Sequence, residues 1–158
     1  MPKAKRPVDS ALVDMVAQNL FNALPIFRKR LVHMDVIQIE YNIPLSHVQV
    51  LAMLNDNGSM SVSEISRRLG IAKPNITPLV DRLIESGLAE RNRDDNDRRV
   101  VNISICDQGR EKLAAIRQTM LEQVSGWAEN FTQAELKELN SSLASVTRIL
   151  GGVAAKKK

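Results

Sequence analysis

The chain has 158 residues, of which 44% are hydrophobic and 25% charged, a composition typical of one globular domain and too apolar for a disordered chain. Its net charge of +4 lies at the ends: residues 1–7 and 151–158 hold six Lys and Arg and no acid, so positions 8–150 have a net charge of −2. A single cysteine excludes a disulfide framework, and the longest apolar run, residues 50–54, is too short to cross a membrane, so we expect a cytoplasmic protein.

Residues 10–40 are predicted to be helical. Their apolar residues recur at steps of three and four, which places them on one face of a helix. Pro25 lies inside this pattern and is expected to kink the helix or divide it in two, and residues 42–44 are expected to end it. The apolar face comprises Val13, Val16, Leu20, Leu24, Phe27, Leu31 and Met34.

Three further helices are predicted from the way they begin. Each starts with a Ser or Thr followed three residues later by Glu or Gln, a pattern in which the two side chains cap each other's backbone N–H groups. The pattern predicts one helix from Ser46 and Gln49 to about Asn55, one from Ser61 and Glu64 to Leu69 before Gly70, and one from Thr132 and Glu135 that Gly151 and Gly152 end.

The central part of the chain has the element order of a winged helix-turn-helix. A helix is expected over 73–86 with Gly87 after it, then two strands over 88–93 and 98–105 joined by a turn at 94–97. Asp107 begins a long helix with an apolar stripe. A short helix, a tight turn, a second helix and a β-hairpin define this motif. The expected fold is therefore mainly α with a small β-hairpin wing.

Residues 45–110 contain four short motifs in a fixed order. They are Leu45, Ser46 and Gln49; Ser63, Glu64, Ile65, Leu69, Gly70 and Ile71; Leu79, Val80, Asp81, Arg82, Leu83, Gly87, Leu88, Ala89 and Arg91; and Asp97, Arg98, Arg99, Asn102, Ile103, Ser104, Ile105 and Gly109. This ordered set resembles the MarR family of bacterial and archaeal transcription regulators. The resemblance implies a homodimer that represses transcription from a pseudo-palindromic DNA duplex, with a ligand-responsive cleft between its DNA-binding and dimerisation parts.

The sequence departs from the family pattern in two places. Cys106 stands where the family usually has a small hydroxyl residue before the long helix, and residues 74–78 replace a segment that more often reads Ser-Thr-Val-Thr-Arg. The second departure changes the surface that would read DNA.

We expect one domain over 10–150 between basic tails at 1–9 and 151–158. Residues 45–106 would form its DNA-binding part, and the flanking helices at 10–40 and 107–150 its dimerisation part. The last helix has an apolar seam at alternating steps of three and four, which favours a partner helix, although the three apolar faces can also satisfy one another within one chain. The seam residues are Leu136, Leu139, Leu143, Val146 and Leu150.

The helix at 73–86 is expected to carry the contacts to DNA. Its apolar residues Ile76, Val80, Leu83 and Ile84 share one side, which leaves the other for bases and phosphates. Pro78 either distorts this helix at its second turn or makes Thr77 its N-cap, and we favour the distorted helix. Ser61 and Ser63 precede free N–H groups that favour a phosphate, although capping alone explains Ser61. The expected contacts are Ser61, Ser63, Lys73, Pro74, Asn75, Thr77 and Arg82.

The turn of the hairpin adds a second set of candidates. Arg98 is expected to enter the minor groove, whose negative potential attracts a guanidinium, and Arg99 to contact phosphate or to be braced by Asp97. Mixed charges at a turn are also typical of a solvated turn. The position of these residues directly after a helix-turn-helix favours the DNA contact.

Other functions have weaker support. No nucleophile elbow, P-loop or GxGxxG motif is present, so we expect no enzyme and no cofactor. His33 and His47 are too few to favour a metal site, and Cys106 is more typical of a small packed residue than of a thiol sensor. A small organic effector therefore fits better than a metal. The alternative is a winged helix that binds only another protein.

Overall fold

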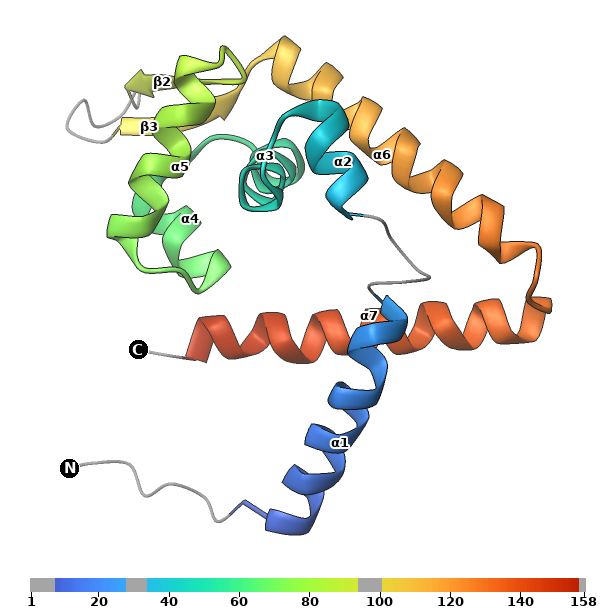
Figure 1. Ribbon diagram of the computed structural model, residues 1–158. Coiled ribbons are helices and arrows are strands. Elements are labelled where there is room, and N and C mark those ends of the chain that lie inside the picture. The colour runs from blue at the N-terminus through green and yellow to red at the C-terminus, as the bar shows by residue number, and fades with distance from the viewer. Residues whose placement is uncertain (1–7, 28–33, 94–100, 157–158) are drawn as a thin grey trace, which may run out of the picture.

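A computed structural model describes residues 8–27, 34–93 and 101–156 (Figure 1). The winged part of the fold lies on one side, α6 leads away from it, and α7 returns beneath it, while α1 projects away from the rest. The described elements are α1 (Ser10–Ile26), α2 (Met34–Tyr41), α3 (Leu45–Asn57), β1 (Met60–Ser61), α4 (Val62–Leu69), α5 (Lys73–Glu85), β2 (Ala89–Arg93), β3 (Val101–Ile105), α6 (Asp107–Ala128) and α7 (Gln133–Lys156).

The three strands form one antiparallel sheet in the order β1-β3-β2. The hairpin of β2 and β3 is paired from Ala89 with Ile105 to Arg93 with Val101, as the sequence predicted for the wing. Strand β1 was not predicted, because two residues are too few to show an alternating pattern. It pairs Met60 with Ile103 and so ties the start of α4 to the wing. The expected fold class, mainly α with a small wing, is confirmed.

A compact apolar core joins the winged part to α2 and the first half of α6. On α5 the side chains of Ile76, Val80 and Leu83 are buried, as their spacing predicted. They pack with buried residues of α2, α3, α4, the sheet and α6: Ile37, Val50, Leu51, Leu54, Ile65, Ile103, Ile105, Leu113 and Ile116. This core places α4 and α5 in a definite orientation relative to the wing.

The predicted start of α3 is wrong by one residue. The helix begins at Leu45 with Pro44 as N-cap, and Ser46 lies inside its first turn without capping it. The Pro44 carbonyl accepts hydrogen bonds from the backbone of His47 and Val48 at 2.9 and 3.2 Å. Proline suits this place, because its fixed φ leads into a helix and the position needs no N–H donor. The helix continues to Asn57, two residues beyond the prediction.

The other two caps are confirmed in different degrees. The Ser61 hydroxyl accepts from the Glu64 N–H at 3.2 Å, and α4 ends at Gly70 in the left-handed region. Thr132 and Glu135 cap each other: the Glu135 N–H donates to the Thr132 hydroxyl at 3.2 Å, and the Thr132 N–H donates to the Glu135 carboxylate at 2.7 Å. The bonds that the Glu135 carboxylate accepts from the Thr132 N–H and from the Thr132 hydroxyl lower the pKa of this carboxyl.

The predicted end of the last helix is wrong. The backbone of α7 remains helical past Gly151 to Lys156, so the expected boundary of the tail at 151 lies inside the helix. A glycine in a helix costs only about 1 kcal/mol relative to alanine. The cost is small enough for the helix to continue into the alanines that follow.

The two prolines inside helices have different positions. Pro78 lies within α5, which runs without a break from Lys73 to Glu85, so the alternative start at Thr77 is wrong. The Thr77 hydroxyl donates to the Lys73 carbonyl at 3.2 Å in this turn. Pro25 lies one residue before the end of α1 at Ile26. Residues 28–33 lie outside the described part, so whether the helix of residues 10–40 divides after Pro25, as expected, is not described.

Gly109 fits the first turn of α6 closely against the base of the wing. A Cβ atom at this position would lie 2.1 Å from the Leu88 carbonyl oxygen and 2.8 Å from Cγ1 of Ile105. The same Leu88 carbonyl accepts a hydrogen bond from the Cys106 N–H at 3.0 Å. Only a residue without a side chain allows α6 to start this close to the sheet.

The outer helices leave many apolar side chains exposed. No residue of α1 is buried, and Leu12, Met15, Leu20, Phe21 and Leu24 are each more than half exposed. On α7 the seam is divided: Leu136 and Leu139 are half-buried, whereas Leu143, Val146 and Leu150 are exposed. The described part of one chain therefore does not satisfy these apolar faces by itself.

Candidate nucleic-acid interface

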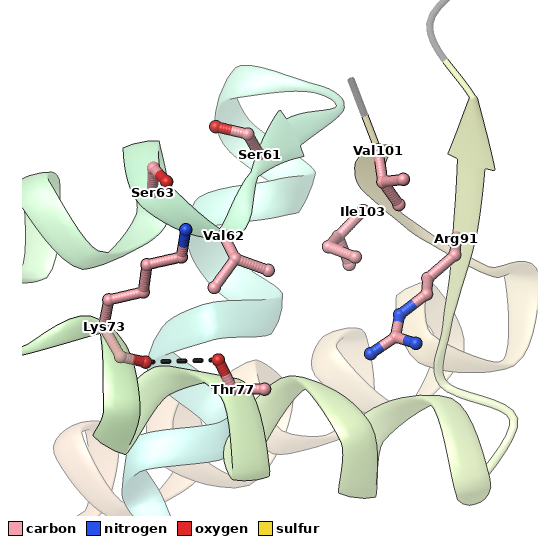
Figure 2. Close-up of a pocket in the computed structure, with 8 residues that line it drawn as sticks. All are labelled: Ser61, Val62, Ser63, Lys73, Thr77, Arg91, Val101 and Ile103. Carbon is pink, nitrogen blue, oxygen red and sulfur yellow. Dashed lines mark hydrogen bonds between the residues drawn. The ribbon is translucent and has the colours of Figure 1, made fainter. Parts of the chain in front are cut away.

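A hollow lies where α4, α5 and the wing meet (Figure 2). Its volume is about 550 Å³. Strand β1 and the start of α4 form one wall, α5 forms the floor, and β2 and β3 form the other wall. The residues that line it are Ser61, Val62, Ser63, Lys73, Thr77, Arg91, Val101 and Ile103. The sequence predicted four of them as DNA contacts, namely Ser61, Ser63, Lys73 and Thr77, and the fold brings these four together.

The polar groups of this hollow are donors of the kind that bind phosphate. Figure 2 shows the Lys73 side chain extended towards α4, beside Ser63. Ser61 caps α4 and faces the hollow at the same time, so the capping and binding interpretations of this residue are compatible. The free N–H groups of the first turn of α4 add positive potential on the same side.

The first half of α5 presents its outer surface to solvent. Lys73, Pro74, Asn75 and Pro78 are exposed, while Ile76 between them is fully buried. Thr77 is half-buried, and its hydroxyl proton is used in the bond to Lys73. The exposed surface is therefore partly apolar, at the two prolines, and partly polar, where Asn75 contributes a side-chain amide.

An ion pair joins the wing to α5. The guanidinium of Arg91 on β2 contacts the carboxylate of Asp81 on α5, and both side chains are about half exposed. The sequence did not predict this pair, because a contact between separate elements leaves no local pattern. The pair holds the wing at a set distance from α5 and reduces the net charge at Arg91.

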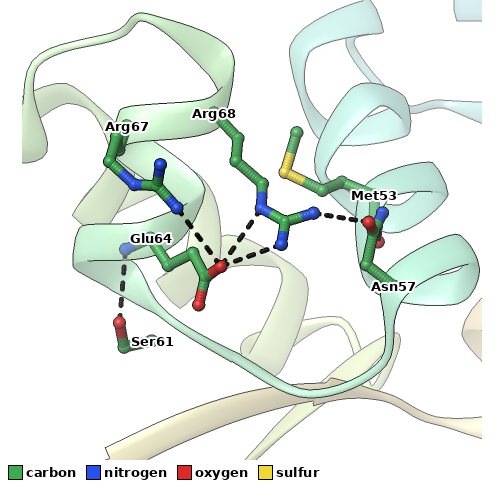
Figure 3. A network of polar contacts seen from close by, with 6 residues as sticks. All are labelled: Met53, Asn57, Ser61, Glu64, Arg67 and Arg68. Carbon is green, nitrogen blue, oxygen red and sulfur yellow. Dashed lines mark hydrogen bonds and ion pairs between the residues drawn. The ribbon is translucent and has the colours of Figure 1, made fainter. Parts of the chain in front are cut away.

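Arg67 and Arg68 are engaged at the other end of α4 (Figure 3). Both guanidinium groups contact Oε1 of Glu64, Arg68 at 2.9 Å and Arg67 at 3.5 Å. Arg68 also donates to the side chain of Asn57, whose amide donates to the Met53 carbonyl at 3.0 Å. This network ties α4 to the end of α3. The bonds of the two arginines indicate that they brace α4 rather than stand free to contact phosphate.

The remaining predicted residues lie elsewhere. Arg82 does not line the hollow of Figure 2 but a second hollow beside α3 and α6. The wing residues Asp97, Arg98 and Arg99 lie outside the described part of the chain, as does His33. His47 lies in the first turn of α3, and its side chain is buried.

Cys106 occupies the N-cap position of α6 without capping it. Its backbone is extended, and its thiol makes no capping bond. Burial and the nearby Glu90 carboxylate raise the pKa of this thiol. A raised pKa disfavours the thiolate, which is the reactive form. These observations support the interpretation of Cys106 as a packed residue.

The described residues form neither a metal-binding cluster nor a helix that could span a membrane. No three His, Cys, Asp or Glu side chains gather there in a way that would hold a metal ion. Among the helices in the described ranges, none combines the length and the apolar character needed to span a bilayer.

Comparison with known proteins gives one consistent family. Residues 41–100 match the model of the MarR family. The chain is 37% identical over 67 residues to the transcriptional repressor MdtR of Bacillus subtilis, covering 42% of this chain and 43% of that protein. It is 31% identical over 98 residues to the repressor IacR of Pseudomonas putida, covering 62% and 59%. The chain thus spans about half the length of these curated relatives.

Solved structures extend the likeness to most of the chain. A MarR family protein from Bacillus stearothermophilus superposes with a TM-score of 0.73 at 21% identity, covering 91% of this chain and 99% of that one. RV1404 from Mycobacterium tuberculosis gives a TM-score of 0.75 at 21% identity, covering 92% and 97%. At this identity the likeness establishes the fold, including the outer helices.

Proposed function

We propose that the chain is a member of the MarR family, whose model matches residues 41–100, and that it is a transcriptional regulator that binds double-stranded DNA. The relatives cited above are named as repressors, and none of them as an enzyme. We propose the same activity here, in the cytoplasm, where a single unpaired cysteine would stay reduced.

One observation carries the proposal. The exposed first half of α5 lies directly beside a hollow lined by two serines, a lysine and an arginine. Hydrogen bonds to phosphate position a protein on DNA, and side chains in the major groove read the bases. The hollow supplies the first kind of contact and the exposed surface of α5 the second. Asn75 would pair with a base edge, and the rings of Pro74 and Pro78 would contact thymine methyl groups.

The exposed apolar faces support a homodimer. Phe21 is 74% exposed and Leu24 64% exposed in a helix that has no buried residue. A helix of this length is marginal in water unless its apolar face is covered. We propose that α1 and the exposed half of the α7 seam, Leu143, Val146 and Leu150, pack against the same helices of a second copy.

A two-fold dimer predicts the geometry on DNA. The α5 helices of the two protomers would enter successive major grooves, with centres about 34–36 Å apart. The wings would then reach the flanking minor grooves, with Arg98 inserted and Arg99 held by Asp97 or by phosphate. We further propose a small organic effector, rather than a metal, as the signal.

The test separates contacts with phosphate from contacts with bases. The purified protein first selects its preferred duplex from a random pool, and binding is then measured over a range of salt. Lys73→Ala is expected to weaken binding to all duplexes alike and to lower the salt dependence by about one counterion. Asn75→Ala is expected to change the preferred sequence, at a cost of about 1–3 kcal/mol on the original site.

Lys137→Ala is the matched control. Lys137 is also an exposed lysine, but it lies on α7 and does not line the hollow. Its removal should leave the salt dependence unchanged. If the wild-type protein binds no duplex, or if its binding does not weaken with salt, the DNA-binding proposal fails and the protein-interaction alternative is favoured.

A further inference from the structure

The outward strip of α5 begins with two proline rings. The strip comprises Pro74, Pro78, Asp81 and Glu85, which recur at steps of four and three and so share one side of the helix. Pro74 and Pro78 are both exposed, whereas Ile76 between them is fully buried on the opposite side. A proline ring has no hydrogen-bonding group. The part of α5 proposed to enter the major groove is therefore a pair of apolar rings.

The backbone at the start of α5 has little to offer a phosphate. The two prolines have no N–H group. The N–H groups of Asn75 and Ile76 both donate to the Ala72 carbonyl, at 2.8 and 3.3 Å. A helix N-terminus binds anions through N–H groups that have no partner, and here most of the first turn has none to give. The start of α5 is therefore better suited to bases than to phosphate.

The other half of the outward strip is acidic. Asp81 and Glu85 each bring a carboxylate, which is repelled by the phosphates that border a groove of DNA. The Asp81 carboxylate is also held by its ion pair with Arg91. The half that can lie against base edges is thus the half that carries the two prolines.

The separation of the two rings fits the repeat of DNA. Pro74 and Pro78 are four residues apart, which at about 1.5 Å per residue separates them by about 6 Å along the helix. Two base-pair steps of about 3.4 Å span about 6.8 Å. The apolar group that a base presents in the major groove is the C5-methyl group of thymine. Two rings at this separation can therefore each cover one methyl group.

We propose that Pro74 and Pro78 read two C5-methyl groups about two base-pair steps apart, and that 5-methylcytosine can supply either of them in place of thymine. Unmodified cytosine has no methyl group there, and methylation at C5 places one at the same edge of the base as in thymine. Affinity for an operator would then depend on cytosine methylation as well as on sequence. This proposal rests on the proposed DNA-binding function and adds the chemical group that α5 recognises.

The test removes or adds one methyl group at a time in the duplex that the purified full-length protein selects. Deoxyuridine replaces each thymine in turn, which deletes the methyl group and keeps the base pair. Two positions in each half-site, about two steps apart, should each lose about fourfold in affinity, because one buried methyl group contributes about 0.8 kcal/mol. At either position 5-methylcytosine should bind about fourfold more tightly than cytosine.

Two variants assign the methyl groups to the rings. Pro74→Ala and Pro78→Ala should each abolish the difference between thymine and deoxyuridine at one of the two positions and keep it at the other. Pro25→Ala is the matched control, since Pro25 is also an exposed proline inside a helix but lies on α1. This control should keep both differences, and thermal unfolding shows whether each variant is folded.

Methyl recognition is refuted, while DNA binding stands, if the wild-type protein binds its selected duplex and deoxyuridine changes nothing. Selected half-sites that lack two thymines at this spacing refute it as well. If folded Pro74→Ala and Pro78→Ala proteins keep both differences, the two rings are not the readers. If the wild-type protein binds no duplex, the proposed function itself fails.

Discussion

Replacing Gly109 by alanine tests the close contact between α6 and the base of the wing. The added Cβ would lie 2.1 Å from the Leu88 carbonyl oxygen, whereas real Cβ contacts essentially never fall under 3.0 Å. The helix or the strand must therefore move by about 1 Å, and the atom in the way is backbone, which yields less easily than a side chain. Overpacking of this kind costs about 1–3 kcal/mol.

The expected loss lies at the upper end of that range. The shift also strains the bond from the Cys106 N–H to the same Leu88 oxygen, and such bonds contribute about 0.5–1.5 kcal/mol. We expect the free energy of unfolding to fall by about 3 kcal/mol, which lowers Tm by about 6–12 °C at this chain length. Urea denaturation and a thermal scan at fixed protein concentration measure both.

Gly126→Ala is the matched control in the same helix. Apart from its chain neighbours and the nearby backbone of its own helix, no atom of the described residues lies within 4 Å of the Cβ that this change would add. Alanine should therefore stabilise α6 by about 0.5–1 kcal/mol. The two substitutions are chemically identical and are expected to have opposite signs. If Gly109→Ala unfolds at the same midpoint as the wild-type protein, the close approach of α6 to Leu88 is refuted.

Three further outcomes follow from described contacts. Burial and the charge of Arg82 lower the pKa of His47, so below about pH 6.5 the unfolded chain binds more protons than the folded chain. The contribution of His47 to the free energy of unfolding should therefore be full above that pH and be lost as the pH falls through the folded-state pKa. Urea denaturation over a range of pH should show this loss in the wild-type protein and not in a His47→Gln variant. Phe21→Glu should convert the proposed dimer to a monomer in sedimentation, whereas Asn19→Glu on the same helix should not; a dimeric Phe21→Glu protein would contradict the role of α1. Asp81→Asn should cost less than about 1 kcal/mol of stability, because both partners are half exposed, yet weaken DNA binding by releasing the wing; unchanged DNA affinity would argue against wing positioning by Arg91.

Local patterns predicted most of the fold. The spacing of Ile76, Val80 and Leu83 placed the buried side of α5 correctly, because a helix repeats every 3.6 residues whatever surrounds it. The caps at Ser61 and Thr132 were predicted because each is made within four residues. Four of the residues predicted to contact DNA line the hollow of Figure 2, because their places near the starts of two helices could be read from the local sequence.

The errors arose where two nearby residues could each begin a helix, or where the residues in contact are far apart in the sequence. The Ser46 and Gln49 pattern resembles a cap, but Pro44 precedes it and begins the helix. The pair Asp81 and Arg91 and the approach of Gly109 to Leu88 join separate elements, so no run of residues signals them. For His47 the sequence predicted no metal site and gave no sign of its burial, which follows only from the way α3 packs against the other elements.

Because α6 packs against the wing at its first turn, a small tilt there displaces the far end of this long helix by several ångströms. It has 22 residues, which at about 1.5 Å per residue gives an arm of about 33 Å. Because Gly109 fixes one end against the wing, a tilt of only about 5° there moves the far end by about 3 Å. That displacement is nearly one base-pair step of about 3.4 Å along the duplex. In the proposed dimer, the spacing of the two α5 helices on DNA would therefore depend on the angle at which Gly109 of α6 meets the Leu88 carbonyl group.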